Sequence, residues 1–257
     1  MILELRNVSK NFGGLKALRG ISFAVKPGEI LSVIGPNGAG KTTVFNVITG
    51  SFPPSEGGIF FREEEITGEK PHQVFRRGIG RTFQTRALFE NMPVRENLVT
   101  SQIHQTRSGL WDTLWPTRRG KEEEGRLRKV AEETAEFVGL GHVPDKLAKN
   151  LTLEERSRLS IGVALAAQPK LLLLDEPMAG LNLEEIEKIV DLVRTVRSRG
   201  ITVCMVEHKM SAVMNVSDRV VVLNFGEKIA EGTPEEIVRH PAVMKAYLGE
   251  KYAAQNR

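Results

Sequence analysis

The sequence is poor in cysteine and has no long hydrophobic run, and both features restrict what the protein can be. Cys204 is the only cysteine among 257 residues, so the chain forms no internal disulfide. Its position in the apolar run ITVCMV predicts a small buried hydrophobic residue. The longest apolar runs, such as residues 171–174, fall well short of the roughly 18 residues that cross a bilayer. The N-terminal stretch MILELRNVSK lacks the pattern of a secretory signal, so we expect a cytoplasmic protein.

Long runs of like charge are absent too. The net charge is +4, and basic pairs occur at 76–77 and 118–119, but no run of five or more like charges appears. Aromatic and basic residues do not interleave as they do in proteins that bind single-stranded nucleic acid. Charges distributed in this way are typical of a solvated surface, and we expect no nucleic-acid partner.

Alternating β-type and helical patterns predict an α/β fold with a mainly parallel sheet covered on both faces. In residues 183–199 the apolar positions, beginning with Leu183 and Ile186, predict one buried helix face. The expected strands are 2–8, 20–25, 29–34, 59–61, 170–175, 201–206 and 219–223, and the expected helices are 41–50, 71–77, 157–167 and 183–199.

The middle of the chain predicts a helical insertion into this sheet domain. Between residues 94 and 151 there is little strand pattern, and Leu127, Ala131 and Val138 recur at helical spacing. We predict one domain over 1–257, with an α/β core at 1–93 and 168–257 and a helical subdomain at 94–167. Residues 104–121 are polar and broken by Gly and Pro, and we expect an inserted loop there.

The stretch GPNGAGKTT at residues 35–43, here called the phosphate loop, matches Gly-x-x-x-x-Gly-Lys-Thr between an expected strand and an expected helix. Glycines permit the tight turn that points N–H groups at phosphate oxygens, and the helix adds its positive dipole end. Lys41 is expected on the β- and γ-phosphates and Thr42 on magnesium. A chance match is the alternative, and the flanking pattern disfavours it. The predicted site for ATP and Mg²⁺ comprises Gly35, Pro36, Asn37, Gly38, Ala39, Gly40, Lys41, Thr42 and Thr43.

Two carboxylates follow the apolar run at 171–174. A buried strand that ends in Asp175 and Glu176 places both near the phosphate loop in folds of this kind. Asp175 is then expected to hold magnesium through water, and Glu176 to act as general base on the attacking water. Taken alone, such a pair is as often a helix N-cap, but the phosphate loop favours the catalytic interpretation.

His208 and Gln84 are weaker candidates by their own chemistry. His208 follows the strand expected at 201–206, at the end where ligands bind α/β sheets, although most histidines at strand ends are structural. Gln84 follows a short β-type stretch that begins at Gly80, and nothing in its own chemistry distinguishes it.

Taken in order, the motifs GPNGAGKT, RTFQ, LLLLDEP and EH resemble those of ATP-binding subunits of ABC transporters, over most of the chain. The resemblance implies the P-loop NTPase fold of an ABC ATPase, with an N-terminal antiparallel β part and an inserted α-helical subdomain. It implies that Phe12 stacks on adenine and that His208 is the switch histidine. It also implies that Gln84 contacts magnesium, senses the γ-phosphate and responds to the transporter. Asn182 falls where the family usually has an aspartate that acts across the dimer.

Further segments narrow the resemblance. GIGRTFQ, LFENMPVRENL, AGLN and HPAVMKAYLGE are together similar to the larger of the two ATPase subunits of LIV-type branched-chain amino acid importers. This implies ATP hydrolysis at the cytoplasmic face of the inner membrane. It also implies three kinds of partner: a second ABC ATPase, two transmembrane permease subunits and, indirectly, a periplasmic binding protein. The cleft beside Gln84, including Leu88 and Phe89, is expected to contact the membrane subunits.

Residues 151–155, LTLEE, depart from the family signature Leu-Ser-Gly-Gly-Gln and are here called the signature segment. In the family this segment contacts the γ-phosphate held by the partner subunit. Thr152 keeps a hydroxyl, but Leu153 and Glu154 replace both glycines. A carboxylate about 4 Å from a phosphate charge costs about 4 kcal/mol at a dielectric near 20, so Glu154 points away or completes a weak site. Glu154 and Glu155 also suit a first helical turn. We hypothesise an asymmetric heterodimer in which this chain's own loop lies in the competent site.

Other functions stay open from the sequence. Within transporters, the alternatives are urea or amide import and lipid or lipopolysaccharide export. Soluble ABC-type ATPases that act on ribosomes or DNA generally carry two cassettes or long coiled-coil insertions, and this chain shows neither. A small-molecule kinase would not need the elements of Gln84 and His208 in this order. A purely regulatory, non-hydrolysing subunit would not need Glu176.

Overall fold

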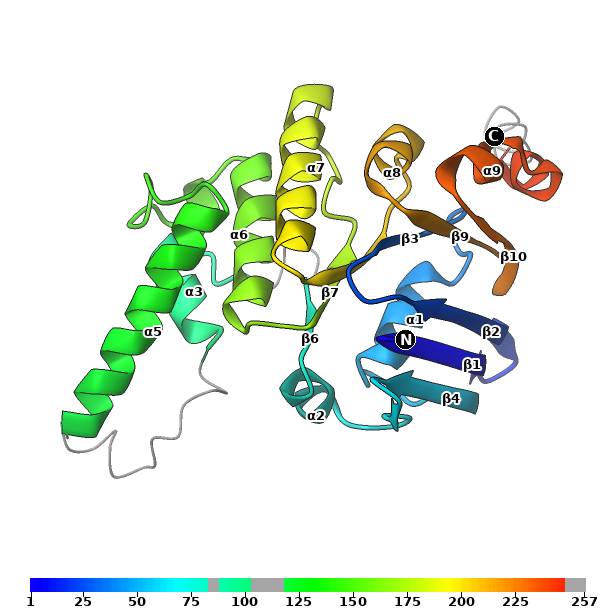
Figure 1. Cartoon of the computed structure of the whole chain (residues 1–257), viewed down its shortest axis with the longest axis horizontal. Coiled ribbons are helices and arrows are strands. Elements are labelled where there is room, and N and C mark those ends of the chain that lie inside the picture. Colours follow the sequence, from blue (N-terminus) through cyan, green and yellow to red (C-terminus); the bar gives the residue numbers. More distant parts are fainter. Residues whose placement is uncertain (83–87, 103–117, 248–257) are drawn as a thin grey trace.

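The computed structural model describes residues 1–82, 88–102 and 118–247, and Figure 1 shows two sheets with helices around them. The strands are β1 (Leu3–Phe12), β2 (Leu15–Val25), β3 (Ile30–Ile34), β4 (Glu56–Phe61), β5 (Glu64–Glu65), β6 (Ile79–Arg81), β7 (Leu171–Asp175), β8 (Thr202–Val206), β9 (Arg219–Asn224) and β10 (Glu227–Gly232). The helices are α1 (Lys41–Ile48), α2 (Pro71–Arg76), α3 (Val94–Thr100), α5 (Arg118–Phe137), α6 (Leu153–Ala166), α7 (Leu183–Ser198), α8 (Met210–Val216) and α9 (Pro234–Arg239), with a 3₁₀ turn at Ala148–Asn150.

The larger sheet is mainly parallel, which confirms the predicted fold class. Its strand order is β10–β9–β3–β8–β7–β6, and only β10 runs antiparallel to its neighbour. In this register Val33 lies opposite Val206, and Val206 lies opposite Asp175. Because parallel strands all end at the same edge, the loops after β3, β7 and β8 meet there although they are far apart in sequence.

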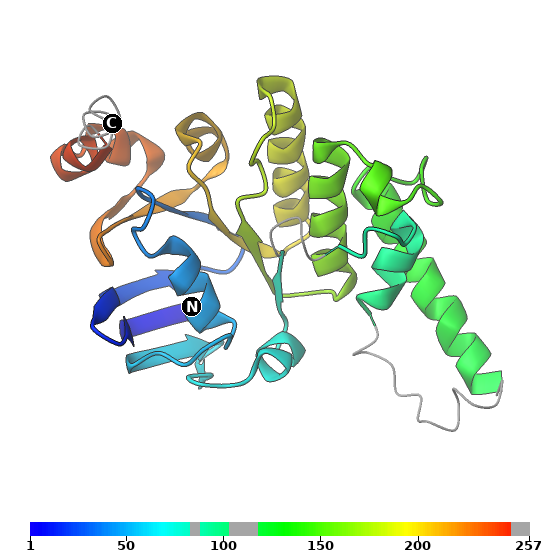
Figure 2. The same ribbon diagram turned by 180° about the vertical axis from the view of Figure 1, so that it is seen from behind.

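The N-terminal sheet is antiparallel, with the order β2–β1–β4–β5. It lies beside α1 on one side of the larger sheet, and Figure 2 shows the same arrangement from behind. The first residues of strand β1 alternate between buried and more exposed, and Leu3 and Leu5 are buried. This period of two is expected of a strand with one face on a core.

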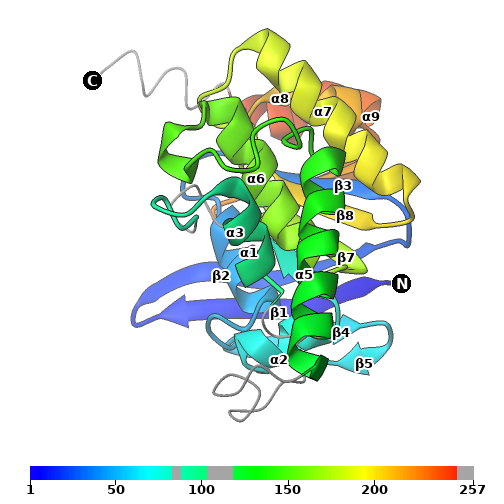
Figure 3. The same cartoon turned by 90° about the vertical axis from the view of Figure 1, so that its left-hand side faces the viewer.

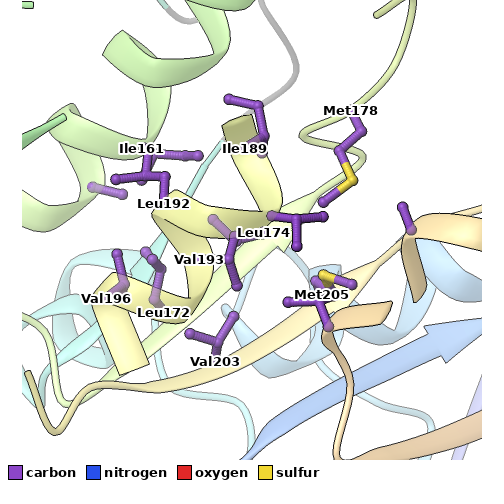
Figure 4. Close-up of a cluster of buried hydrophobic side chains, with 14 of the residues drawn as sticks. Ile161, Leu172, Leu174, Met178, Ile189, Leu192, Val193, Val196, Val203 and Met205 are labelled. Carbon is purple, nitrogen blue, oxygen red and sulfur yellow. The ribbon is translucent and has the colours of Figure 1, made fainter. Parts of the chain in front are cut away.

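Successive residues of the central strands point into two separate hydrophobic cores. Leu171 and Leu173 of β7 join the core beneath α1 and the N-terminal sheet, whereas Leu172 and Leu174 join the core beneath α6, α7 and α8. Figure 4 shows the second core, where Leu174 and Met205 of the sheet lie near Val193 of α7. Both faces of the sheet are therefore buried, which explains the uninterrupted apolar run of β7.

Helices α3, α5 and α6 pack against one another beside the larger sheet, with α5 outermost (Figures 1 and 3). Gly162 of α6 lies close to α3, since a Cβ atom there would lie 3.1 Å from Leu98 Cδ2. The division into a core at 1–93 and 168–257 and a helical subdomain at 94–167 stays a prediction. No helix within the described ranges is both long and apolar enough to cross a membrane.

The structure corrects three details of the sequence prediction. Helix α5 begins at Arg118, inside the loop expected at 104–121, and residues 104–117 of that stretch lie outside the described residues. Helix α6 begins at Leu153, not at residue 157, because Thr152 caps it and the signature segment forms its first turn. Leu183, predicted on the buried face of α7, is 74% exposed, whereas Ile186 is buried as predicted. Leu183 lies in the first turn of α7, whose end projects beyond the neighbouring helices in Figure 1. The predicted burial of Cys204 is confirmed.

Candidate functional site

The phosphate loop joins β3 to α1, as its sequence predicts. Its three glycines all have positive φ, with 79° at Gly38 and 101° at Gly40, a region that side chains other than glycine enter at a cost. Gly35 cannot carry a side chain without a shift of the backbone, because a Cβ atom there would lie 2.1 Å from Leu223 O. The glycines therefore serve both the turn and the packing of the loop against β9.

Lys41 begins α1 and is buried within the loop. Its Nζ donates hydrogen bonds to Gly35 O at 2.6 Å and to Pro36 O at 3.0 Å. Burial of an ammonium group requires such acceptors. The interaction holds a positive charge at the centre of the loop.

A cleft of about 420 Å³ opens beside the loop. Phe12, Glu176 and Phe225 line it together with the described loop residues from Asn37 to Thr43. The Phe12 residue at this cleft is 45% exposed, so a ring surface is available, and its stacking on adenine stays a prediction. Phe52 packs edge-on against that ring at 5.1 Å between centroids.

Asp175 and Glu176 follow β7 but differ in surroundings. The Asp175 side chain is only 3% exposed, and its Oδ2 accepts a hydrogen bond from Arg81 Nη2 at 2.7 Å. Oδ1 of Asp175 is buried and accepts no hydrogen bond from the residues that the structure describes. Glu176 is more exposed and has a φ of 50°, an uncommon value for a residue other than glycine. Strain of this kind is frequent at functional sites.

The side chains of His208 and Glu176 approach each other from the loops after β8 and β7. His208 Nδ1 lies 3.8 Å from Glu176 Oε2, with 48% of the histidine side chain and 27% of the glutamate side chain exposed. The main-chain N–H of Glu176 donates to Val206 O, so the end of β8 supports the turn that carries Glu176. The geometry thus brings together two residues that the sequence placed at the ends of different strands.

Glu207 is a site residue that the sequence analysis missed. Its side chain is fully buried and accepts hydrogen bonds from Met178 N at 2.9 Å and His208 N at 3.1 Å. Burial raises the pKa of this carboxyl, and the backbone donors partly oppose that shift. The available signal was the same as for Asp175, a carboxylate at the end of an apolar run. Glu207 therefore ties the loop after β7 to the loop after β8.

The signature segment is a well-capped helix start. Glu154 forms an ion pair with Arg158 at 2.6 Å, and Arg158 also donates to Val138 O. The Glu155 carboxylate accepts from Lys146 Nζ and from Thr152 N, both at 2.8 Å. Burial raises the pKa of Glu155, but the hydrogen bonds from Lys146 and the Thr152 main chain outweigh it and lower the pKa.

The remaining predicted residues are placed as follows. Asn182 is the N-cap of α7, and its Oδ1 accepts from Glu185 N at 3.0 Å. Gln84 lies outside the described residues. Leu88 is buried, and Phe89 is 51% exposed. Across the described parts of the chain, no three His, Cys, Asp or Glu side chains gather as a metal site.

Comparisons with known proteins identify the family of the chain. The ABC transporter family matches residues 18–179, and the family described as branched-chain amino acid ATP-binding cassette transporter matches residues 227–253. The high-affinity branched-chain amino acid transport ATP-binding protein LivG of Escherichia coli K12 is 40% identical over 97% of this chain and 98% of its own length.

Solved structures show the same fold. An ATP-binding cassette of an ABC transporter, solved in its ADP conformation, is 34% identical with a TM-score of 0.84, over 96% of this chain and 98% of its own. A dimeric bacterial ABC transporter cassette is 26% identical with a TM-score of 0.76, over 90% of this chain and 98% of its own. Similarity of this extent shows that the chain belongs to the ABC transporter family, as a nucleotide-binding cassette whose ATP hydrolysis powers transport.

Proposed function

We propose that this cassette hydrolyses magnesium-bound ATP in the cleft beside the phosphate loop. The observation that carries the proposal is that Glu176 lines this cleft and lies 3.8 Å from His208. Thr42 would hold the magnesium ion and Asp175 would hold it through water, together with Gln84 by resemblance. The buried Oδ1 of Asp175 fits this role because it is an acceptor still able to bind a donor. Such an ion, when bound, neutralises phosphate charge.

The other residues of the cleft have separate roles in nucleotide binding and hydrolysis. Glu176 accepts a proton from the attacking water as the water oxygen bonds to the γ-phosphorus and the bond to the β-phosphate oxygen breaks. His208 holds the Glu176 carboxylate and the γ-phosphate in position. The phosphate-loop amides and Lys41 bind the β- and γ-phosphates, and Phe12 stacks on the adenine.

The test is single-turnover hydrolysis by the wild type and by Glu176→Gln. We expect Glu176→Gln to bind ATP with unchanged affinity and to hydrolyse it about 10²–10⁴-fold more slowly, the usual contribution of a general base. Glu187→Gln, on the exposed face of α7, is the matched control and should behave as wild type. Equal single-turnover rates for Glu176→Gln and wild type would favour a regulatory subunit without hydrolysis.

We propose branched-chain or related hydrophobic amino acids as the transported solute. The support is the similarity to LivG and the match of residues 227–253 to the branched-chain family. The chain would then act at the cytoplasmic face of the inner membrane, beneath two permease subunits fed by a periplasmic binding protein. Co-purification of permeases from a urea, amide or lipid transporter in place of branched-chain permeases would overturn this assignment.

Phe89 is the proposed contact with the permease. It is half exposed, while its main-chain N–H donates to Asn97 Oδ1 at 2.9 Å, so a rigid support presents the ring. A photo-crosslinker at Phe89 should capture a permease subunit in the assembled transporter. Capture of the permease from Phe225, which lies at the nucleotide cleft, would show that the label is unselective.

We further propose that the working dimer is asymmetric. The ion pair between Glu154 and Arg158 compensates the charge that the sequence analysis identified as a problem. Leu153 still obstructs close approach of the signature segment to the partner's nucleotide, because its side chain is 53% exposed where the family signature has glycine. The site that this signature segment completes on the partner ATPase is therefore impaired, whereas this chain's own loop meets the partner's signature.

The asymmetry is tested in the purified heterodimer. Glu176→Gln in this chain should remove most of the turnover of the dimer, because it inactivates the competent site. The chain alone should bind ATP and hydrolyse it slowly, and addition of the partner should raise the rate. Fast, cooperative turnover by the isolated chain would contradict the heterodimer.

A further inference from the structure

Arg81 is a buried cation that the proposed hydrolysis does not use. It ends β6, and its side chain is 6% exposed. Besides Asp175, its guanidinium donates to Asn46 Oδ1 of α1 at 2.8 Å and to Oγ1 of Thr49, the C-cap of α1, at 3.1 Å. A buried charge is costly unless its partners are well placed. Arg81 therefore joins the acid of β7 to the helix that begins with Lys41.

Asp175 is held at two points by consecutive residues. Arg81 Nη2 donates to its carboxylate Oδ2 at 2.7 Å, and the Asp175 main-chain N–H donates to Thr82 Oγ1 at 3.0 Å. Thr82 in turn donates its main-chain N–H to Leu173 O at 2.9 Å. Both the backbone and the side chain of Asp175 are thus oriented from β6, and Oδ1 is the carboxylate oxygen left for a ligand.

We propose that Arg81 and Thr82 are positioning residues for the magnesium site, acting through Asp175. This inference rests on the proposed function, because it assumes that Asp175 holds the ion. Outer partners that orient the groups around a bound metal typically change metal affinity by 10–100-fold when they are removed. A carboxylate with one oxygen in an ion pair presents the other in a single direction, so the ordering is complete before the ion binds.

Arginine suits this role better than lysine. Its planar guanidinium carries several donors in a fixed geometry, and here they reach β7 and α1 at once. A lysine could neutralise Asp175 but could not hold both elements with one rigid group. The proposal therefore predicts that Arg81→Lys, which keeps the charge, still weakens the site.

The experiment measures binding, without turnover, in the full chain. A non-hydrolysable ATP analogue is bound first in EDTA and then at increasing magnesium concentrations, and the concentration that half-saturates the gain in affinity is determined. Arg81→Lys and Thr82→Val should each raise that concentration by about 10–100-fold, with metal-free affinity unchanged. Glu187→Gln, on the exposed face of α7 and outside this hydrogen-bond network, is the control and should match wild type.

Each other outcome has a definite meaning. An unchanged magnesium requirement, or a lowered one, in the folded variants overturns the proposal. Equal losses of metal-free and metal-bound affinity also overturn it, because they show a merely structural role. Thr82→Val carries the test if Arg81→Lys does not fold. Wild-type affinity that does not depend on magnesium would instead contradict the proposed function itself.

Discussion

Thr152 and Glu155 exchange hydrogen bonds across the first turn of α6: Glu155 N donates to Thr152 Oγ1 at 3.1 Å, and Thr152 N donates to Glu155 Oε2 at 2.8 Å. This reciprocal pair is a capping box. The signature Leu-Ser-Gly-Gly-Gln has Ser and Gln at the same spacing. The altered segment therefore keeps a hydroxyl and a side-chain acceptor at the two positions that cap the helix, and it replaces the two glycines between them.

The first prediction concerns the contribution of this capping box to stability. Thr152→Ala should lower the free energy of unfolding by about 1 kcal/mol, because Glu155 N loses its acceptor. Thr152→Ser keeps a hydroxyl and should be close to wild type. Urea unfolding of the three proteins makes the comparison, and equal stability of Thr152→Ala and wild type would show that the cap contributes nothing.

Restoring the two glycines of the family signature tests whether the signature segment impairs hydrolysis at the partner's site. The double variant Leu153→Gly/Glu154→Gly, assembled with a partner ATPase, should increase hydrolysis at the partner's phosphate loop. Turnover is followed with Glu176→Gln also present in this chain, so that only the partner's site contributes. Two glycines in a helical turn each cost about 1 kcal/mol, and the matched double alanine variant controls for loss of side chains alone. No gain over the alanine variant would count against asymmetry.

Gly35 and Gly38 of the phosphate loop are predicted to differ in how strongly substitution by alanine destabilises the protein. Both have positive φ, which costs an alanine about 1–3 kcal/mol. Gly38→Ala meets only this strain, because no described atom lies within 4 Å of its Cβ position. Gly35→Ala also meets Leu223 O at 2.1 Å, so it should be clearly the less stable variant in thermal unfolding. The reverse order would contradict the packing of this loop on β9.

Glu207 is predicted to make stability depend on pH. Because burial raises its pKa above 4.5, the folded state binds more protons than the unfolded state between 4.5 and the raised value. The free energy of unfolding therefore falls as pH rises through this window. The difference in Tm between wild type and Glu207→Gln should decrease as pH rises above 4.5. A difference that is constant with pH would mean that Glu207 titrates normally.

Local patterns in the sequence predicted much of the site. The phosphate loop is contiguous, and its glycines, Lys41 and following helix are specified by neighbours in the chain. The carboxylates of Asp175 and Glu176 were found because an apolar strand ends there. The roles of Arg81 and Glu207 were not predicted. An arginine before a loop, or an acid before a histidine, can have many structural or functional roles, and only the residues that contact it in the structure identify its role.

The sequence by itself determined the turn of the phosphate loop, most strands of the larger sheet and the apolar run that contains Cys204, since each depends on residues close together in the chain. Tertiary structure alone decided which groups meet. Arg81 reaches Asp175 across 94 positions, and Glu207 reaches Met178 across 29, because the order β3–β8–β7–β6 gathers these strand ends at one edge. It also decided that Leu183 is exposed and that Glu154 pairs with Arg158. The periodicity of apolar residues predicts which face of a helix or strand a residue lies on. Only the packing of other elements decides whether that face is covered.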